Sequence, residues 1–449
     1  MKRILLSLLL GVPAITIAGG FQLNLQGLKA VAMGGAFSGV ASDATTVFFN
    51  PAGMSNLNHH NVTVGFNLVD ASVSIQTPEV ANTDQTSGKG TPIHLYYVGQ
   101  VNDKLSLGFL VNNQFGSASS FADDWQGRYI IQNISLKTFM FQPTISYKVH
   151  EKLSIGAGFV YALGSFSTEK AVPVASNSDT ITEGKARLEG SGDGVGYNIG
   201  IYSQFLTLGD DAKNTKFAIG IDYRSAMPVD LTNGEATFTD IPISLRDKFP
   251  ETTGFVSKIT LPSVLTFGLS IKHTVAEKWS LEFAYDLNMT GWSSYDTLAF
   301  DFKNDATPDS KQIQDWDNVI THRLGFDFTY KKKYSVRVGL YQDNTPMKDN
   351  LVSPHLPGVT QVAYTAGLGY KLSDKVSIDF SFIRQSANRD DVSLAQYKVE
   401  DGNFVQDANG NKIQTGEFAY KFNRKVNVYG LAVNIAFGGP KKEAETVVK

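Results

Sequence analysis

Apolar side chains recur at every second position in many segments of this 449-residue chain. Between residues 362 and 370, for example, Val362, Tyr364 and Leu368 alternate with small or polar residues such as Thr365. Successive side chains of a β-strand point to opposite faces, so this segment would form a strand with one apolar and one polar face. A transmembrane β-barrel is built from such strands, because their outer faces meet lipid and their inner faces meet a polar interior.

The alternation predicts an all-β fold of about fourteen strands, an even number as is usual for bacterial outer-membrane barrels. Clear strands are expected at 105–115, 139–148, 153–166, 217–227, 265–272, 279–290, 320–330, 334–342, 362–370, 376–385 and 426–437. Further strands are expected near 61–75, 93–101 and 195–205. A soluble β-sandwich also alternates, but its exposed face would be rich in charge.

The expected connections alternate between short turns and long loops. The short turns are at 102–104, 150–152, 275–278, 331–333 and 373–375, and the long loops are at 77–91, 116–133, 167–185, 300–317, 342–358 and 388–415. In outer-membrane barrels the short turns lie on the periplasmic side and the long loops lie outside the cell. The alternation therefore gives the barrel an expected orientation.

Composition removes several function classes. The chain has no cysteine, which excludes disulfides, thiolate metal sites and cysteine nucleophiles. Its net charge of -3 gives no electrostatic reason to bind nucleic acid. The mean hydropathy of -0.12 is too low for a helical membrane protein. The sequence indicates no metal site and no cofactor.

The first eighteen residues have the pattern of a secretory signal peptide, with Lys2 and Arg3 before an apolar stretch that ends near Ala18. The alternative is a membrane anchor, but the stretch is shorter than the roughly 20 residues that a spanning helix needs. We expect the mature chain to start at Gly19. Export without a spanning helix, together with strands that suit lipid, predicts the outer membrane of a Gram-negative-type bacterium.

Residues 19–58 do not alternate and are rich in Gly and Ala, and we refer to them as the hatch. A barrel of this size would otherwise enclose a water-filled hole, so we expect the hatch to plug the lumen. The barrel is expected at 59–437, followed by a charged tail at 438–449. Phe437 ends the last strand, and a terminal aromatic resembles the signal by which barrel-assembly machinery selects its clients.

Several short motifs resemble those of the FadL-type outer-membrane channels for long-chain fatty acids and other hydrophobic compounds. They are Gly20-Phe21-Gln22-Leu23-Asn24, Asn50-Pro51-Ala52, Trp125-Gln126-Gly127-Arg128-Tyr129, Leu261-Pro262, Gly291-Trp292-Ser293-Ser294 and Asp343-Asn344-Thr345-Pro346. The resemblance spans essentially the whole mature chain. Where the family often continues with an acid and an arginine, this chain has Gly358-Val359-Thr360, so no ion pair is expected at that corner.

The resemblance implies a mechanism. A hydrophobic compound is caught among the extracellular loops, passes to a tighter site inside the barrel, and leaves sideways through a gap at a kink in the third strand. In this chain Asn112, Asn113 and Gln114 interrupt the period of the third strand and are the candidates for that opening. The alternative is that they are the polar end of the strand. Asn50, Pro51 and Ala52 are the candidates for a gate; alternatively they form a turn into the first strand.

Candidate ligand contacts follow from the same reasoning. Phe21, Leu23 and Leu25 would line the interior site or anchor the hatch, and Phe115 and Phe121 would belong to the outer groove. By strand parity the charges expected to face the lumen are Asp222, Arg224, Lys272, Glu282, Asp286, Arg323, Asp327, Arg337 and Asp379. We expect most of them to pair with one another and with the hatch. Arg224, Arg323 and Arg337 are the candidates for binding a fatty-acid carboxylate.

The sequence therefore predicts a monomeric channel whose partners are a hydrophobic small molecule, outer-membrane lipid and the assembly machinery, with no nucleic acid. Fatty acids are the leading substrate, and aromatic hydrocarbons are the alternative within the same fold. A general porin is less favoured because it would have no hatch. An outer-membrane lipase or protease is also less favoured, because none of the seven histidines lies in a recognisable triad pattern.

Overall fold

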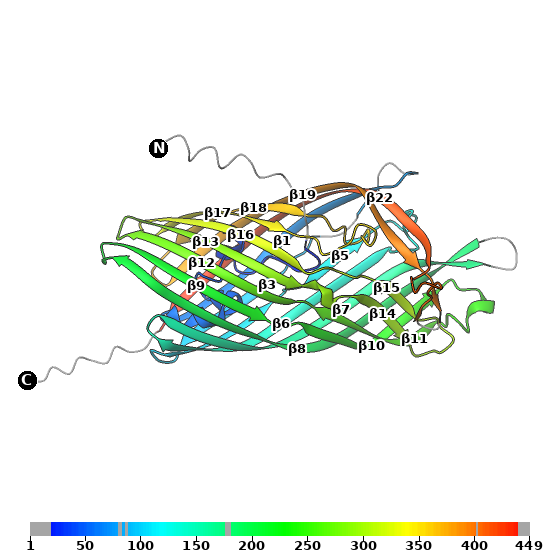
Figure 1. The fold of residues 1–449 in the computed structure, drawn as a ribbon, viewed down its shortest axis with the longest axis horizontal. Helices are drawn as coiled ribbons and strands as arrows, with labels where there is room; N and C mark the ends of the chain where they lie inside the picture. Colours follow the sequence, from blue (N-terminus) through cyan, green and yellow to red (C-terminus); the bar gives the residue numbers. More distant parts are fainter. Residues whose placement is uncertain (1–18, 80–82, 86–88, 176–180, 401–402, 439–449) are drawn as a thin grey trace, which may run out of the picture.

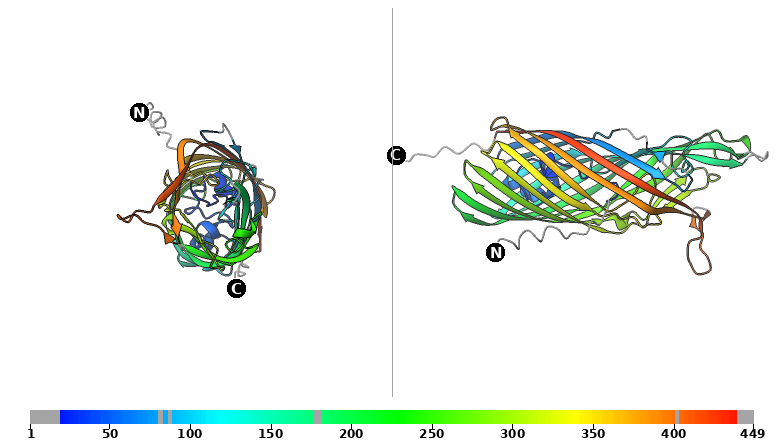
Figure 2. Two further views of the ribbon diagram at one scale, coloured as in Figure 1. Left: turned by 90° about the vertical axis from the view of Figure 1, so that its right-hand side faces the viewer. Right: turned by 90° about the horizontal axis from the view of Figure 1, so that it is seen from above.

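The strands alternate between buried and exposed side chains, as the sequence predicts. In β18 (Gln361–Lys371), Tyr364 and Leu368 are 64% and 57% exposed, whereas Ala363 and Thr365 are buried. The apolar side chains of this strand thus cover the outer surface, where lipid would contact them. In the computed structural model the strands form an antiparallel barrel around the N-terminal part of the chain (Figure 1, Figure 2).

The structure describes residues 19–79, 83–85, 89–175, 181–400 and 403–438. The helices are α1 (Leu28–Ala32), α2 (Thr46–Phe49), η1 (Pro51–Asn56), η2 (Ile243–Leu245) and η3 (Trp292–Ser294). The strands of the first half are β1 (His60–Gln76), β2 (Thr83–Asp84), β3 (Ile93–Gln100), β4 (Leu105–Asn112), β5 (Gly116–Ser120), β6 (Asn133–His150), β7 (Leu153–Ala175), β8 (Ile181–Gly209), β9 (Lys213–Arg224), β10 (Met227–Thr239) and β11 (Thr252–Leu261). Those of the second half are β12 (Ser263–Val275), β13 (Trp279–Gly291), β14 (Thr297–Phe302), β15 (Ser310–Ile313), β16 (Val319–Tyr330), β17 (Tyr334–Asp343), β18, β19 (Val376–Tyr397), β20 (Val399–Glu400), β21 (Asn403–Phe404) and β22 (Gln414–Phe437).

Within the described residues the barrel closes as a ring of 14 strands, which confirms the predicted number. The ring runs β1, β3, β4, β6, β7, β8, β9, β12, β13, β16, β17, β18, β19 and β22. The first and last strands close it, pairing from His60 with Phe437 to Gln76 with Lys421. The wall therefore has no free edge around this ring.

The strands extend further toward the extracellular end than the sequence analysis predicts. β7 and β8 pair through most of the expected loop 167–185, and β19 and β22 take up much of the expected loop 388–415. The prediction was also wrong in missing β10 and β11. The cause is visible in β8, where Ala186 and Leu188 are buried while the charged residues Arg187 and Glu189 that alternate with them are exposed. Above the lipid the alternation is inverted, with apolar side chains inside and polar side chains outside.

The hatch lies inside the barrel, where Figure 2 shows its blue ribbon within the ring of strands. Its backbone is tied to the inner wall. The amide groups of Phe37 and Ser38 both donate to Asp286 Oδ2 at 2.9 Å, and the amide of Gly34 donates to Thr365 Oγ1 at 3.0 Å. None of the described helices combines the length and apolar character needed to traverse a bilayer.

Two expectations concern residues without a described structure. The expected signal peptide at 1–18 lies outside the described residues, and so does the tail from 439 onward. The expected inward-facing charges lie within them. Asp222, Arg224, Glu282, Asp286, Arg323, Asp327, Arg337 and Asp379 are all buried, and Lys272 is half-buried.

Candidate functional site

The third strand of the ring is interrupted. β4 ends at Asn112, which pairs with Met140 of β6, and β5 begins at Gly116, which pairs with Lys137. Residues 113–115 therefore lie opposite only the two residues between those partners, so one extra residue forms a β-bulge. We call residues 113–115 the strand interruption. Because of the bulge, two consecutive side chains, Gln114 and Phe115, are both buried.

The N-terminal segment pairs with this interruption from inside the barrel. The amide of Leu23 donates to the carbonyl of Gln114 at 2.8 Å, and the amide of Gly116 donates to the carbonyl of Phe21 at 2.9 Å. Gln22 and Phe115 thus form an isolated antiparallel bridge. Residues 21–23 supply the backbone partners that a neighbouring wall strand would otherwise supply.

The side chain of Asn113 holds the interruption against both neighbouring strands. Its Nδ2 donates to the carbonyl of Thr138 at 2.7 Å, and its Oδ1 accepts from the amide of Ile93 at 3.0 Å. Asn112 is fully buried and its Nδ2 donates to the hydroxyl of Tyr96 at 3.4 Å. The three residues expected to mark the opening therefore lie at the irregular part of the wall.

An apolar cavity of about 40 Å³ lies on one side of the N-terminal segment. Its lining residues are Phe21, Ser117, Ile134, Leu136, Phe166, Ile259, Tyr295, Leu298, Gln314, Trp316, Met347, Ser353, His355 and Leu356. The ring of Phe21 packs among three other aromatic rings. Its centroid lies 4.9 Å from that of Trp292, 5.3 Å from Tyr295 and 5.7 Å from Trp316.

A polar cavity of about 50 Å³ lies beside the next residues of the same segment. Its lining includes Gln22, Leu23, Asn24, Gln26, Phe48, Gln114, Asp222, Arg224, Asn288 and Arg323. Arg323 donates from NH2 to Asn24 Oδ1 at 2.6 Å, while its Nε has no partner among the described residues. Arg224 donates to Gln142 Oε1 at 2.7 Å and to the carbonyl of Phe48 at 3.1 Å. Both guanidinium groups are buried without a salt bridge to a described carboxylate.

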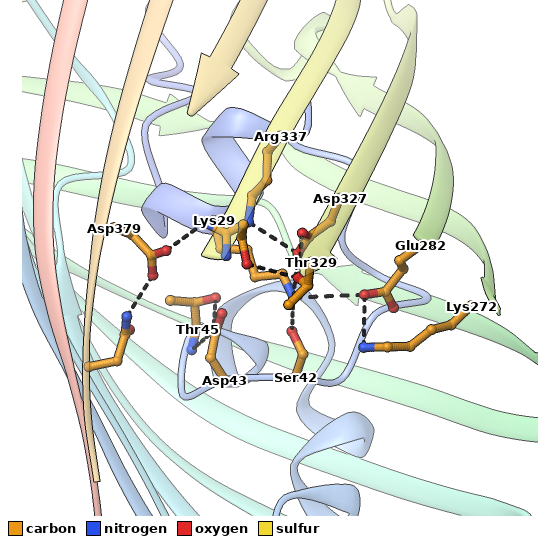
Figure 3. Close-up of polar contacts among 12 residues, drawn as sticks. Lys29, Ser42, Asp43, Thr45, Lys272, Glu282, Asp327, Thr329, Arg337 and Asp379 are labelled. Carbon is orange, nitrogen blue, oxygen red and sulfur yellow. Dashed lines mark hydrogen bonds and ion pairs between the residues drawn. The ribbon is translucent and has the colours of Figure 1, made fainter. Parts of the chain in front are cut away.

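Arg337 lies elsewhere, in a buried network of charges that fixes α1 to the wall (Figure 3). It contacts Asp327 at 3.1 Å and Asp379 at 2.5 Å. Lys29 of α1 contacts Asp327 at 3.1 Å and Glu282 at 3.7 Å. Arg337 is therefore already paired with two carboxylates of the protein. Of the three arginines expected to bind a substrate carboxylate, Arg224 and Arg323 are then the better candidates.

Asn50 organises the turn between α2 and η1. Its Nδ2 donates to the carbonyls of Ser38 and Ile201 at 3.1 and 3.0 Å, and its Oδ1 accepts from the amide of Ala52 at 3.1 Å. Pro51 occupies the first turn of η1, where its missing N–H needs no partner. These bonds join the turn to Ser38 of the hatch and to Ile201 of β8. A gating role for Asn50 would therefore act by fixing the position of the hatch against the wall.

Glycine at position 200 lets this turn approach the wall. A Cβ at Gly200 would lie 2.3 Å from Asn50 Oδ1 and 2.8 Å from Pro51 Cδ. The Asn50-Pro51-Ala52 turn therefore fits against β8 only because no side chain stands there.

The turn gives a first testable prediction. Replacing Asn50 and Pro51 together by alanine is expected to abolish uptake while the barrel still assembles. The double variant leaves the carbonyl of Ser38 and the amide of Ala52 without their side-chain partner and removes the contact with Ile201 of β8, a cost of about 2–4 kcal/mol that falls on the hatch. Uptake is measured with radiolabelled substrate, and hatch order by limited proteolysis of the purified barrel. Asn56→Ala is the control, because Asn56 makes one 3.5 Å contact within η1; wild-type uptake by the assembled double variant would reject the prediction.

A family described as "Outer membrane protein transport protein (OMPP1/FadL/TodX)" matches residues 9–437. The chain belongs to this family. It is an outer-membrane protein, as the sequence predicts.

Relatives of the FadL family resemble the chain over most of its length. A long-chain fatty acid transport protein of Salmonella typhi is 25% identical over 392 residues, covering 81% of this chain and 86% of the relative. Outer membrane protein P1 of Haemophilus influenzae is 23% identical and covers 96% of this chain and 98% of that protein.

Solved structures share the fold. A FadL homologue of Pseudomonas aeruginosa has a TM-score of 0.69 at 17% identity, covering 95% of this chain and 99% of that one. The toluene transporter TbuX of Ralstonia pickettii has a TM-score of 0.64 at 14% identity, covering 92% and 100%.

The FadL-type ligand residues expected from the sequence lie in different places. Phe21 and Phe115 pack together with ring centroids 6.0 Å apart. Phe121 stacks on Trp125 at 4.1 Å, within the same large apolar cluster. Leu23 borders the polar cavity, and Leu25 belongs to a separate cluster with Val31, Tyr341, Ala363, Ile383, Val426 and Val428. Sequence reasoning missed Tyr295 and Trp316; of the aromatic residues around Phe21 only Trp292 stood in a recognised motif.

Proposed function

We propose that this chain takes up hydrophobic compounds across the outer membrane and releases them sideways through the strand interruption. The observation that carries the proposal is the double role of the N-terminal segment. The Phe21 ring lines the apolar cavity, and the Phe21 carbonyl accepts from the amide of Gly116, the residue that follows the strand interruption. A compound that takes the place of the Phe21 ring would therefore also loosen the segment that covers the irregular wall.

The inverted alternation supports the direction of movement. The extracellular half of the barrel has apolar side chains inside, whereas the half around the hatch contains the buried charges of Figure 3. Moving an acyl chain from an apolar site into a polar lumen costs about 0.8 kcal/mol for each methylene. A sideways exit into lipid avoids that cost, because the compound stays in apolar surroundings.

The polar cavity suits the head group of a fatty acid. Arg224 and Arg323 are buried cations without a paired carboxylate among the described residues, and they line the same cavity. A substrate carboxylate placed between them would accept from both guanidinium groups, neither of which is within salt-bridge distance of Asp222, the carboxylate that lines the same cavity. The names of the Salmonella and Escherichia coli relatives, long-chain fatty acid transport proteins, agree with this substrate class.

Aromatic hydrocarbons are a second candidate substrate. The rings of Trp292, Tyr295 and Trp316 around Phe21 favour it, because an aromatic compound can take over the edge-to-face contacts that Phe21 makes. The toluene transporters TbuX and TodX share the fold. We propose that the chain is a transport protein with a small-molecule partner and no enzymatic role. Its monomeric state and its selection by the barrel-assembly machinery remain predictions.

The two arginines distinguish the candidates. Replacing Arg224 or Arg323 by methionine is expected to lower oleate uptake by about tenfold or more, because a buried charge-assisted contact contributes about 1.5–3 kcal/mol. Toluene uptake should not change. Uptake is measured with labelled oleate and toluene in cells that lack their own transporter. Arg384→Met is the control, since Arg384 is exposed on the outer face of β19; oleate uptake that survives both substitutions would contradict the carboxylate site, and no uptake of either compound by the wild type would contradict the function.

A further inference from the structure

A polar atom without a partner borders the apolar cavity. The indole Nε1 of Trp316 is buried and makes no hydrogen bond to any described residue. Trp316 is 4% exposed and lines the cavity beside Phe21 and Tyr295. Buried N–H groups in native proteins nearly always have an acceptor, because leaving one unpaired is costly. An unpaired indole at a cavity wall therefore marks a position where a ligand would supply the acceptor.

None of the described residues that line the same cavity is charged. His355, its one titratable imidazole, is bonded through Nδ1 to Ser353 Oγ at 2.6 Å. Burial lowers the pKa of His355 to about 4, so the ring is neutral at neutral pH. An ionised head group would meet no counter-charge here, in contrast to the polar cavity with Arg224 and Arg323. Burial of an unpaired charge is strongly unfavourable.

We propose that the apolar cavity selects neutral apolar compounds that carry a hydrogen-bond acceptor, such as ketones or esters, and that Trp316 donates to this acceptor. This inference rests on the proposed uptake function and specifies its substrate class. A hydrocarbon of the same shape that displaces the Phe21 ring leaves the indole N–H unpaired. A carboxylate is held by the arginines of the polar cavity instead.

The test uses three ligands of similar size: ethylbenzene, acetophenone and benzoate. Binding of each to the purified full-length barrel in one detergent is measured by titration calorimetry, for the wild type and for Trp316→Phe. The substitution keeps an aromatic ring and removes the donor. We expect acetophenone affinity to fall about fivefold, the effect of losing one hydrogen bond, while the affinities for ethylbenzene and benzoate stay the same. Trp279→Phe is the matched control, because Trp279 begins β13 at the opposite end of the barrel from the cavity.

Three results would overturn the inference. The first is unchanged acetophenone affinity in Trp316→Phe. The second is an equal loss for ethylbenzene, which would show that the indole acts only as packing. The third is an equal loss for benzoate, which would show that the cavity accepts charge. Failure of the wild type to bind any of the three ligands would instead contradict the proposed function together with this inference.

Discussion

Deletion of Gln114 is expected to abolish uptake while the barrel still assembles. The deletion removes the extra residue opposite β6, so that Asn113 and Phe115 would face Phe139 and Thr138 in an unbroken ladder. Strand parity is unchanged on both sides of the deletion, because Asn112 and Gly116 keep their partners. The wall would then be continuous where we propose that the substrate leaves.

The measurement is substrate uptake by cells that carry equal amounts of assembled protein, judged by heat-modifiable mobility on gels. Gln114→Ala is the matched control. It removes the same side chain but keeps the extra residue, so the bulge and toluene uptake should persist; toluene is compared because the Gln114 side chain also lines the polar cavity. Wild-type uptake by the deletion variant would mean that the bulge is not the exit.

Replacing Arg337 by methionine is expected to lower the free energy of unfolding by about 3–5 kcal/mol, the usual cost of removing one partner of a buried ion pair. Arg337 contacts Asp327 and Asp379, and both carboxylates are buried. Among the described residues, Lys29 is then the cation left within salt-bridge distance of Asp327, and Asp379 keeps its contact with Asn434 at 2.6 Å. Two buried negative charges would then be poorly compensated.

The stability change is measured by urea unfolding of the detergent-refolded barrel. A triple variant in which Asp327 and Asp379 are also replaced by asparagine should recover much of the loss, because it removes the uncompensated charges. The control variant Arg384→Met, whose substitution is on the outer face, should have the same urea midpoint of unfolding as the wild type. An Arg337→Met protein that unfolds at the wild-type midpoint would show that the network contributes little.

Strand parity and turn length made part of this site predictable. The inward position of Arg337 follows from alternation, and its contact with Asp327 follows from the short turn at 331–333, which sets these two residues opposite each other. The contact with Asp379 could not be predicted, because β18 lies between the two strands. Gly369 of β18 makes it possible, since a Cβ there would lie 2.7 Å from Arg337 and 2.8 Å from Asp379.

The strand interruption had a local signal in the sequence, but its partners had none. The polar run at 112–114 indicated an irregular strand, and the structure has the interruption at 113–115. The pairing of Phe21 and Leu23 with it joins segments about ninety residues apart and depends on where the hatch lies. Trp316 lies in the expected loop 300–317, where apolar and polar residues do not alternate, so nothing in the sequence indicated that it is a neighbour of Phe21. The extracellular strands were missed because their outer faces meet water instead of lipid. Their polar side chains therefore point outward and their apolar side chains inward, the reverse of the alternation in the membrane-spanning part.

Locking the N-terminal segment onto the strand interruption tests the central claim most directly. Gln22 and Phe115 form a bridge whose hydrogen bonds come from the flanking residues, and such pairs have Cα atoms about 4.5 Å apart, within the range that a disulfide spans. The native chain has no cysteine, so Gln22→Cys combined with Phe115→Cys gives a single defined cross-link. We expect the oxidised variant to take up no substrate and reduction by dithiothreitol to restore uptake, with each single-cysteine variant insensitive to the reductant. Equal uptake by the oxidised and reduced forms would contradict the account.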